Sequence, residues 1–156
     1  MSSMQEALAE GNYYTHHPDR TIALSGAFNV IHPGYTRMIQ GALNFGKVVI
    51  ILNSDEWVRR HKRVLMMPWQ DRREVLLSIR GVAAVEPVDD SDGTVCEALR
   101  RLRPHVFGNG GFRTKQQTPE SDLCHELGIA CVWGIGGGER DVYDAQVLES
   151  LRVGEV

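Results

Sequence analysis

The sequence contains few cysteines, and their spacing matches no familiar motif. Cys96, Cys124 and Cys131 include no C-x-x-C pair, and their number is odd. A chain of this size with unpaired cysteines is typical of a reducing compartment, so we expect free thiols in a cytoplasmic protein. We also expect these thiols to behave as small buried hydrophobic groups.

Long apolar runs are also missing. No stretch of about 18 apolar residues occurs, and residues 1–20 hold no apolar core of the kind that a secretory signal has. We therefore expect neither export nor a membrane-spanning helix.

An excess of basic charge is absent as well. The formal net charge is −3 and the isoelectric point is near 6.1, so no overall positive field would bind a nucleic-acid backbone or an anionic membrane. Neither nucleic acid nor a membrane is expected as a partner. Any phosphate group has to be bound by a local arrangement of residues.

The sequence does have the composition of one soluble globular domain. Its 156 residues are 42% hydrophobic and 24% charged, which is enough apolar material for a core without disulfides or metals. Residues 1–20 are polar and contain no strand-like run, so we interpret them as an N-terminal appendage. Residues 21–156 are expected to form a single domain.

The domain opens with the pattern of a strand, a helix and a second strand. "TIALSGAF" (21–28) is an apolar run, and residues 29–46 carry apolar side chains at helical spacing before Gly46. "KVVIILNSD" (47–55) is almost entirely apolar and β-branched, which is typical of a strand covered on both faces. This is the βαβ unit of a parallel sheet.

The alternation continues to residue 135. Helical spacing and strand-like runs follow one another in this order: helix 68–80, strand 82–88, helix 92–104, strand 105–109, helix 118–128 and strand 129–135. Alternating strands and helices predict an α/β fold, a Rossmann-like three-layer sandwich with a mainly parallel sheet of about five strands. Ligands of such sheets bind beyond the carboxyl ends of the strands.

Two of these helices are preceded by capping residues. Asp92 or Thr94 is expected to cap the helix over 92–104, and Thr118 or Ser121 the helix over 118–128. Side-chain oxygens at such positions accept hydrogen bonds from the first backbone amides of a helix.

The stretch "SGAFNVIHPG" (25–34) joins the first strand to the first helix. Gly26 lets the chain leave the strand tightly, and Gly34 lets a helix begin close to a ligand. The amides and dipole of that helix would attract an anion, and His32 would donate a hydrogen bond to phosphate. The alternative is an ordinary loop in which His32 caps the helix or packs against it.

"GAFNVIHPGY" (26–35) resembles the G-x-F-D-x-x-H-x-G-H signature of the cytidylyltransferase-like nucleotidyltransferases. This superfamily includes glycerol-3-phosphate cytidylyltransferases and heptose-phosphate adenylyltransferases. The resemblance continues in the same order through "NSD" (53–55), Lys62, "MPWQDRREVLLSIRGV" (67–82) and "RPHVFGNGGFR" (103–113). It covers roughly residues 21–150.

The resemblance implies transfer of a nucleotidyl group from a nucleoside triphosphate to a small phosphate or phosphonate acceptor, with release of pyrophosphate. CMP is favoured over AMP as the transferred group, so CTP or ATP is the expected donor. Mg²⁺ is expected to be bound through the nucleotide phosphates, and a homodimer is expected. The reaction needs positioning and charge stabilisation rather than a covalent intermediate.

The resemblance also assigns roles to residues. Among the catalytic candidates, His32 and Lys62 stabilise the triphosphate, and Tyr35 donates a hydrogen bond to the α-phosphate. Lys62 lies in the basic run "RRHKR" (59–63), expected to be a mobile loop that either clamps phosphate or is simply solvated. The nucleotide-binding candidates are Gly26, Ala27, Phe28, Gly34, Asn109, Gly110, Gly111 and Arg113. The acceptor-binding candidates are Asn29, Arg72 and Phe112.

The sequence departs from the family pattern at four places. Tyr35 replaces the second signature histidine, Asn29 replaces an aspartate, Phe112 replaces the aspartate of G-G-D-R, and "DVYDAQVL" (141–148) replaces a Ser/Thr-rich stretch. Loss of a charge-assisted contact to the transition state costs about 2 to 4 kcal/mol unless another group substitutes. Three hypotheses follow: a divergent nucleotidyltransferase, a nucleotide-binding protein without transferase activity, and a related fold redirected to hydrolase or lyase chemistry on a nucleotide or phosphate ester.

Overall fold

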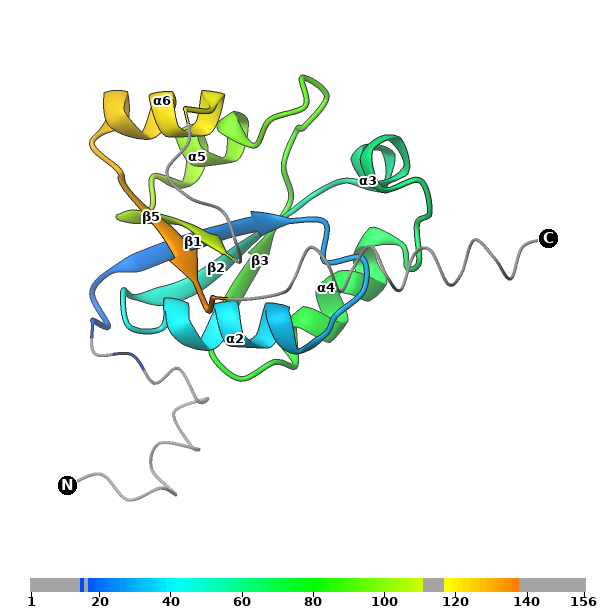
Figure 1. Cartoon of the computed structure of the whole chain (residues 1–156), viewed down its shortest axis with the longest axis horizontal. Helices are drawn as coiled ribbons and strands as arrows, with labels where there is room; N and C mark the ends of the chain where they lie inside the picture. Colours follow the sequence, from blue (N-terminus) through cyan, green and yellow to red (C-terminus); the bar gives the residue numbers. More distant parts are fainter. Residues whose placement is uncertain (1–14, 16, 111–116, 138–156) are drawn as a thin grey trace, which may run out of the picture.

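The computed structural model describes residues 15, 17–110 and 117–137, and within them a single parallel sheet (Figure 1). Its five strands are hydrogen-bonded in the order β3-β2-β1-β4-β5. The strands are β1 (Thr21–Gly26), β2 (Lys47–Leu52), β3 (Val82–Glu86), β4 (Val106–Gly110) and β5 (Ala130–Ile135). Every neighbouring pair is parallel, as expected for strands that alternate with helices.

The helices cover both faces of this sheet. Figure 1 shows α2 and α4 on one face and α5 and α6 on the other. The helices of the described residues are α2 (Pro33–Ala42), α3 (Asp55–Lys62), α4 (Trp69–Leu77), α5 (Cys96–Leu102) and α6 (Pro119–Leu127). This arrangement confirms the Rossmann-like three-layer sandwich predicted from the sequence.

Two hydrophobic clusters hold the layers together. Successive residues of β1 point to opposite faces. Ile22 and Leu24 pack toward the layer of α2 and α4, while Ala23 packs toward α5 and α6. The central strands are therefore apolar on both faces, which explains the continuous apolar run of β2.

The strand order reverses direction at β1. The chain moves outward from β1 to β2 and β3, then crosses back to β4 on the other side of β1. In α/β sheets, ligands bind at such a switch point, beyond the carboxyl ends of the strands, here β1 and β4. The segment that follows β1 and the end of β4 therefore border the candidate site.

The basic run of residues 59–63 is not the loop that was expected. Residues Asp55–Lys62 form helix α3, and Arg63 ends it with φ of 69°. Ser54 caps this helix by accepting a hydrogen bond from the Trp57 amide. Val58 is the single buried residue of α3, so the helix has almost no apolar periodicity by which to recognise it.

One predicted cap is confirmed in full, and the other is confirmed for Thr94 but not for Asp92. Thr118 and Ser121 form a reciprocal capping box at the start of α6. Helix α5 begins after Val95, whose side chain makes no cap hydrogen bond, but the Thr94 hydroxyl accepts a hydrogen bond of 3.3 Å from the Cys96 amide, the first of the helix. Asp92 accepts from Thr94, so its carboxylate stabilises the preceding turn rather than the helix.

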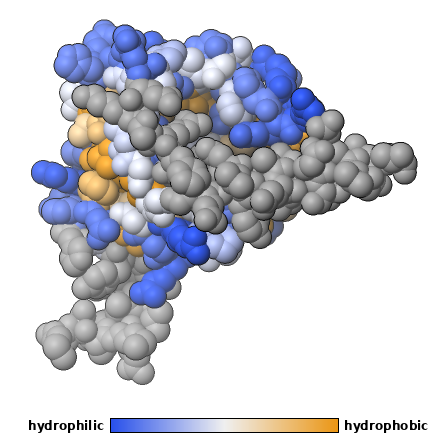
Figure 2. Space-filling model, in the orientation of Figure 1, coloured by the Kyte–Doolittle hydropathy of each residue, from blue (hydrophilic) through white to orange (hydrophobic). Residues whose placement is uncertain are grey.

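The helices, the surface and the cysteines of the described residues can be compared with what the composition predicts. No described helix is long and apolar enough to cross a membrane. Figure 2 shows mainly hydrophilic side chains over α6 and α3, with a smaller apolar area beside β5. Cys96, Cys124 and Cys131 are all free thiols, and the first two are buried.

Candidate functional site

The turn from β1 to α2 begins with a strained residue. Phe28 has φ of 45°, in the left-handed region, and its side chain is fully buried. This backbone conformation costs a non-glycine residue about 1 to 3 kcal/mol, which the surroundings must offset. The contacts around Phe28 therefore hold the turn in this one conformation.

The ring of Phe28 fills the space directly beneath this turn. It lies 4.5 Å from the ring of Tyr35, centroid to centroid. A Cβ atom at Gly26 would lie 3.1 Å from the Phe28 ring, so a side chain at Gly26 would crowd the turn. The absence of a side chain at Gly26 leaves room for the Phe28 ring, and the predicted contact of Gly26 with nucleotide stays a prediction. The described contacts of the Phe28 side chain are with the core and not with an open surface.

His32 caps helix α2 with its own imidazole. The Gly34 amide donates a hydrogen bond of 3.0 Å to His32 Nδ1, and the side chain of His32 is almost completely buried. Because Nδ1 accepts, the neutral imidazole carries its proton on Nε2. The capping alternative from the sequence is therefore present in the structure, and the contact of His32 with phosphate stays a prediction.

Tyr35 lies in the first turn of α2, in the place of the second signature histidine. Its side chain is buried, and its ring lies 4.8 Å from the His32 ring, centroid to centroid. The Tyr35 ring thus packs on the rings of both His32 and Phe28. Its predicted contact with the α-phosphate stays a prediction.

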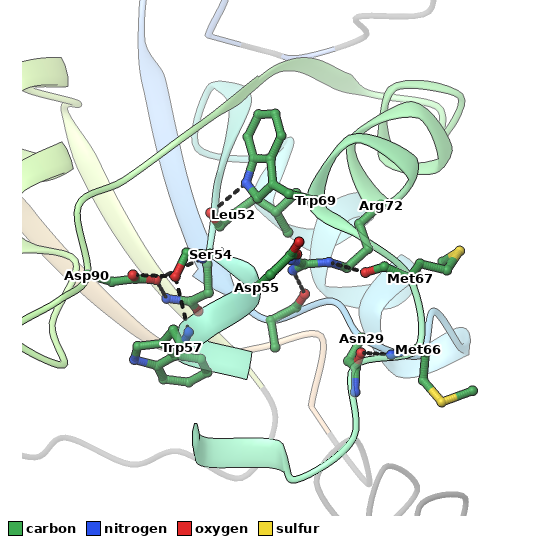
Figure 3. Close-up of polar contacts among 12 residues, drawn as sticks. Asn29, Leu52, Ser54, Asp55, Trp57, Met66, Met67, Trp69, Arg72 and Asp90 are labelled. Carbon is green, nitrogen blue, oxygen red and sulfur yellow. Dashed lines mark hydrogen bonds and ion pairs between the residues drawn. The ribbon is translucent and has the colours of Figure 1, made fainter. Parts of the chain in front are cut away.

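Asn29 binds the segment between α3 and α4. Its Nδ2 donates to the carbonyl of Val64 at 2.6 Å, and its Oδ1 accepts from the amide of Met66 at 2.9 Å (Figure 3). The side chain is 5% exposed. Both polar ends of the carboxamide are therefore bound to the protein itself, and the predicted role in acceptor binding stays a prediction.

Arg72 is a fully buried cation that joins three segments. Its guanidinium donates to the carbonyls of Met67 and Ala27, at 3.0 and 2.7 Å, and forms an ion pair of 2.7 Å with Asp55 (Figure 3). A buried charge needs such complete pairing, and the planar guanidinium can supply several directed donors at once. Through the Ala27 carbonyl, these contacts fix the β1–α2 turn against α4. Binding of an acceptor by Arg72 stays a prediction.

Asp90 is a second buried anchor, and it was not predicted from the sequence. The buried carboxylate of Asp90, in the segment after β3, accepts hydrogen bonds from the Asn53 side chain and from the amide and hydroxyl of Ser54. These bonds fix the end of β2 and the first turn of α3. "NSD" gave a hint of this site, but nothing in the sequence distinguishes Asp90 from its acidic neighbours Asp89 and Asp92.

The basic residues of α3 lie at its carboxyl end, where the helix dipole favours cations. Arg59 and Arg60 are exposed, and Lys62 is half-buried. Trp57 and His61 stack at a centroid distance of 4.2 Å on the same helix. The phosphate-binding role of Lys62 stays a prediction, now from a helix end rather than from a loop.

The end of β4 borders the other side of the switch point. Asn109 donates to the carbonyl of Val132 at 3.4 Å, which ties β4 to β5. A Cβ atom at Gly110 would collide with the Met38 side chain of α2, so glycine is required for this packing. Gly111, Phe112 and Arg113, predicted to bind nucleotide or acceptor, lie outside the described residues.

Comparison with known families finds a match that covers most of the described fold. The profile of the Cytidylyltransferase-like family matches residues 23–132, which span β1 to β5 and include both the β1–α2 turn and Arg72. The chain belongs to the cytidylyltransferase-like family. The resemblance to this family drawn from the sequence is confirmed.

Several proteins of known name are similar to this member of the family. The chain is 34% identical over 110 residues to the bifunctional protein HldE of Streptomyces coelicolor, covering 69% of this chain but only 23% of that protein. It is 28% identical over 144 residues to the FAD synthase of Methanothermobacter marburgensis, covering 85% of this chain and 86% of the synthase.

A solved structure supports the fold. The crystal structure of the lipopolysaccharide core biosynthesis protein from Thermoplasma volcanium matches with a TM-score of 0.61 at 14% identity. The match covers 73% of this chain and 94% of that one. At this identity the likeness shows the cytidylyltransferase-like fold alone.

Proposed function

We propose that the protein transfers an AMP group from ATP to a small phosphate or phosphonate acceptor and releases pyrophosphate. The choice of AMP departs from the preference for CMP drawn from the sequence. It is supported by the similarity to an FAD synthase over most of both chains, because FAD contains an adenylyl group. CTP remains the second candidate donor, on the motif resemblance alone.

The observation that carries the proposal is the state of His32. The Gly34 amide binds Nδ1, so the neutral ring keeps its proton on Nε2. A neutral donor next to a triphosphate gains strength as negative charge grows on the phosphate during attack. The ring is held between Tyr35 and the helix terminus, so little ordering is needed when the nucleotide binds.

Lys62 supplies the second group in this proposal. Helix α3 is held at its start by the Asp90 carboxylate, which fixes Ser54, and at Asp55 by the ion pair with Arg72. An ammonium group carried by a fixed helix neutralises charge on the α- and β-phosphates without a large ordering cost. The acceptor phosphate then attacks the α-phosphate in line, and pyrophosphate leaves.

Mg²⁺ is proposed to enter with the nucleotide. Among the described residues there is no group of three or more His, Cys, Asp and Glu side chains that could hold a metal ion. Mg²⁺ commonly binds substrate phosphates together with few protein ligands. The metal would supply charge neutralisation at the β- and γ-phosphates when bound.

The test is release of pyrophosphate from ATP and CTP with a panel of acceptors. A suitable panel holds flavin mononucleotide, a sugar 1-phosphate, glycerol 3-phosphate and a phosphonate. The proposal expects turnover with ATP and at least one acceptor, and its loss in the His32→Ala variant. Absence of turnover with every pair would contradict it.

A second candidate is a nucleotide-binding protein without transferase activity. The observation that favours it is the burial of Tyr35, which is packed on Phe28 where the family signature has a histidine. This candidate expects triphosphate binding without turnover in the native protein and a gain of activity in the Tyr35→His variant. Hydrolase or lyase chemistry on a nucleotide remains a hypothesis that no described contact favours. The homodimer and the cytoplasmic location also remain predictions.

A further inference from the structure

The segment between α3 and α4 is held against the β1–α2 turn by side chains. Asn29 binds the carbonyl of Val64 and the amide of Met66, and Arg72 binds the carbonyl of Met67. Figure 3 shows Asn29 facing Met66 and Arg72 facing Met67. Three main-chain groups of this segment are thus held by side chains, two by Asn29 of the β1–α2 turn and one by Arg72 of α4.

The chemistry of Asn29 matches this task closely. The Val64 carbonyl can only accept and the Met66 amide can only donate, so the partner must offer one donor and one acceptor. A carboxamide does so, and its orientation is determined by its partners. A carboxylate, which the family signature has at this position, cannot donate to Val64. Aspartate at position 29 would instead place negative charge 2.6 Å from a carbonyl oxygen.

The same segment leads directly to Lys62. Arg63 turns the chain with φ of 69°, and the Val64 amide donates to the carbonyl of Lys62 at 2.8 Å. Val64 is therefore bound on one side to Asn29 and on the other to the residue that ends α3. Because residues 62–64 form one hydrogen-bonded turn, a shift of Val64 would also move Lys62.

We propose that Asn29 is a positioning residue for Lys62, acting through the Val64 carbonyl and the tight turn at Arg63. Asparagine replaces the signature aspartate at this position, and its amide donor holds the end of α3 in its present place. The proposal rests on the proposed function, since it gives Lys62 a task at the triphosphate.

The test is a double-mutant cycle on turnover, with Asn29→Asp, Lys62→Met and the double variant. Asn29→Asp is expected to lower kcat about tenfold or more, and Asn29→Ala, which adds no charge, is expected to lower it in the same direction. In the Lys62→Met background the same Asn29 substitutions are expected to cost less than about threefold, because coupled residues are not additive. Undiminished cost in that background, or full activity of Asn29→Asp, would overturn the proposal.

The matched control is Asn44→Asp, which makes the same chemical change at an exposed amide that binds the Gly41 carbonyl within its own turn. Its kcat is expected to stay within about twofold of the native value. A loss as large as that of Asn29→Asp would show a general charge effect and would overturn the proposal.

Failure of the proposed function can be told apart from failure of this inference. If the native protein releases no pyrophosphate with any pair, the proposed function fails, and the same cycle is measured on the dissociation constant for ATP. Non-additive losses of affinity would still support the link from Asn29 to Lys62, and additive losses would overturn it. Hydrogen exchange at the Met66 amide checks the bond itself, with exchange at least about tenfold faster in Asn29→Asp expected and unchanged exchange contradicting the proposal.

Discussion

The guanidinium of Arg72 donates a hydrogen bond of 2.7 Å to the carbonyl of Ala27, a residue 45 positions earlier in the chain. Ala27 directly precedes the strained Phe28, so the helix that carries Arg72 determines the shape of the turn at the candidate site. The same guanidinium binds Met67 and Asp55. One buried cation therefore keeps the turn, the α3–α4 segment and α3 in a single arrangement.

Replacement of Arg72 is expected to destabilise the whole domain. Arg72→Met leaves the Ala27 and Met67 carbonyls and the partly exposed Asp55 carboxylate without their partner, and the loss of these bonds is expected to cost about 2 to 3 kcal/mol. Urea denaturation followed by circular dichroism measures this loss. Arg73→Met on the same helix is the control, expected to change the free energy of unfolding by less than about 0.5 kcal/mol. Equal losses in the two variants would contradict the role given to Arg72.

Asp90 is expected to be as important for stability as a core residue. Asp90→Asn turns one acceptor oxygen into a donor that faces other donors at Asn53 and Ser54, and the loss of these bonds is expected to cost about 2 kcal/mol. The exposed residue Asp19 provides the matched control, because Asp19→Asn makes the same change in an exposed turn. Thermal unfolding checks both variants. A native melting temperature for Asp90→Asn would show that the network contributes little.

At Phe28, the glycine variant is expected to be more stable than the alanine variant, the reverse of the usual order. Both Phe28→Ala and Phe28→Gly lose the buried ring, but only glycine accepts φ of 45° without strain. Phe28→Gly is therefore expected to be about 1 kcal/mol more stable than Phe28→Ala. At the buried helical residue Leu76 the order is expected to be normal, with Leu76→Ala the more stable variant. The same order at both sites would refute the strain at Phe28.

The sequence alone predicted the sheet well because its signals are local. Apolar β-branched runs marked β2, and helical spacing after "PGY" marked α2. The site is less predictable, because its anchors depend on contacts between distant segments. Nothing in "QDRRE" shows that Arg72 is buried, since burial requires Ala27, Met67 and Asp55 to meet around it.

Helix α3 could not be predicted for a related reason. Its stability comes from the cap at Ser54 and the Asp90 carboxylate rather than from an apolar stripe. The motif resemblance drew attention to Asn29 and His32, whose roles at a ligand stay predictions. It did not reveal that their side chains bind the Val64 segment and the Gly34 amide, because these partners differ from those that a bound substrate would offer.

The thiol of Cys124 is expected to make stability fall at high pH. Burial raises its pKa from 9.0 to about 12, with a further contribution from the neighbouring Cys131. The folded state therefore favours the protonated thiol, and this contribution is full below pH 9.0 and is lost as the pH rises from about 9 toward 12. Urea unfolding between pH 8 and about 10.5 is expected to show a shallower decline for Cys124→Ala than for the native chain. Identical slopes would contradict the raised pKa.

The most direct test of the central claim is calorimetric titration with ATP, CTP and Mg²⁺. We expect the native protein to bind at least one triphosphate, and we expect His32→Ala and Lys62→Met each to weaken binding about tenfold through loss of charge-assisted contacts. Lys47→Met, at the opposite end of β2, is expected to bind as the native protein does. No binding by the native protein, or equal affinity in all four proteins, would contradict the account.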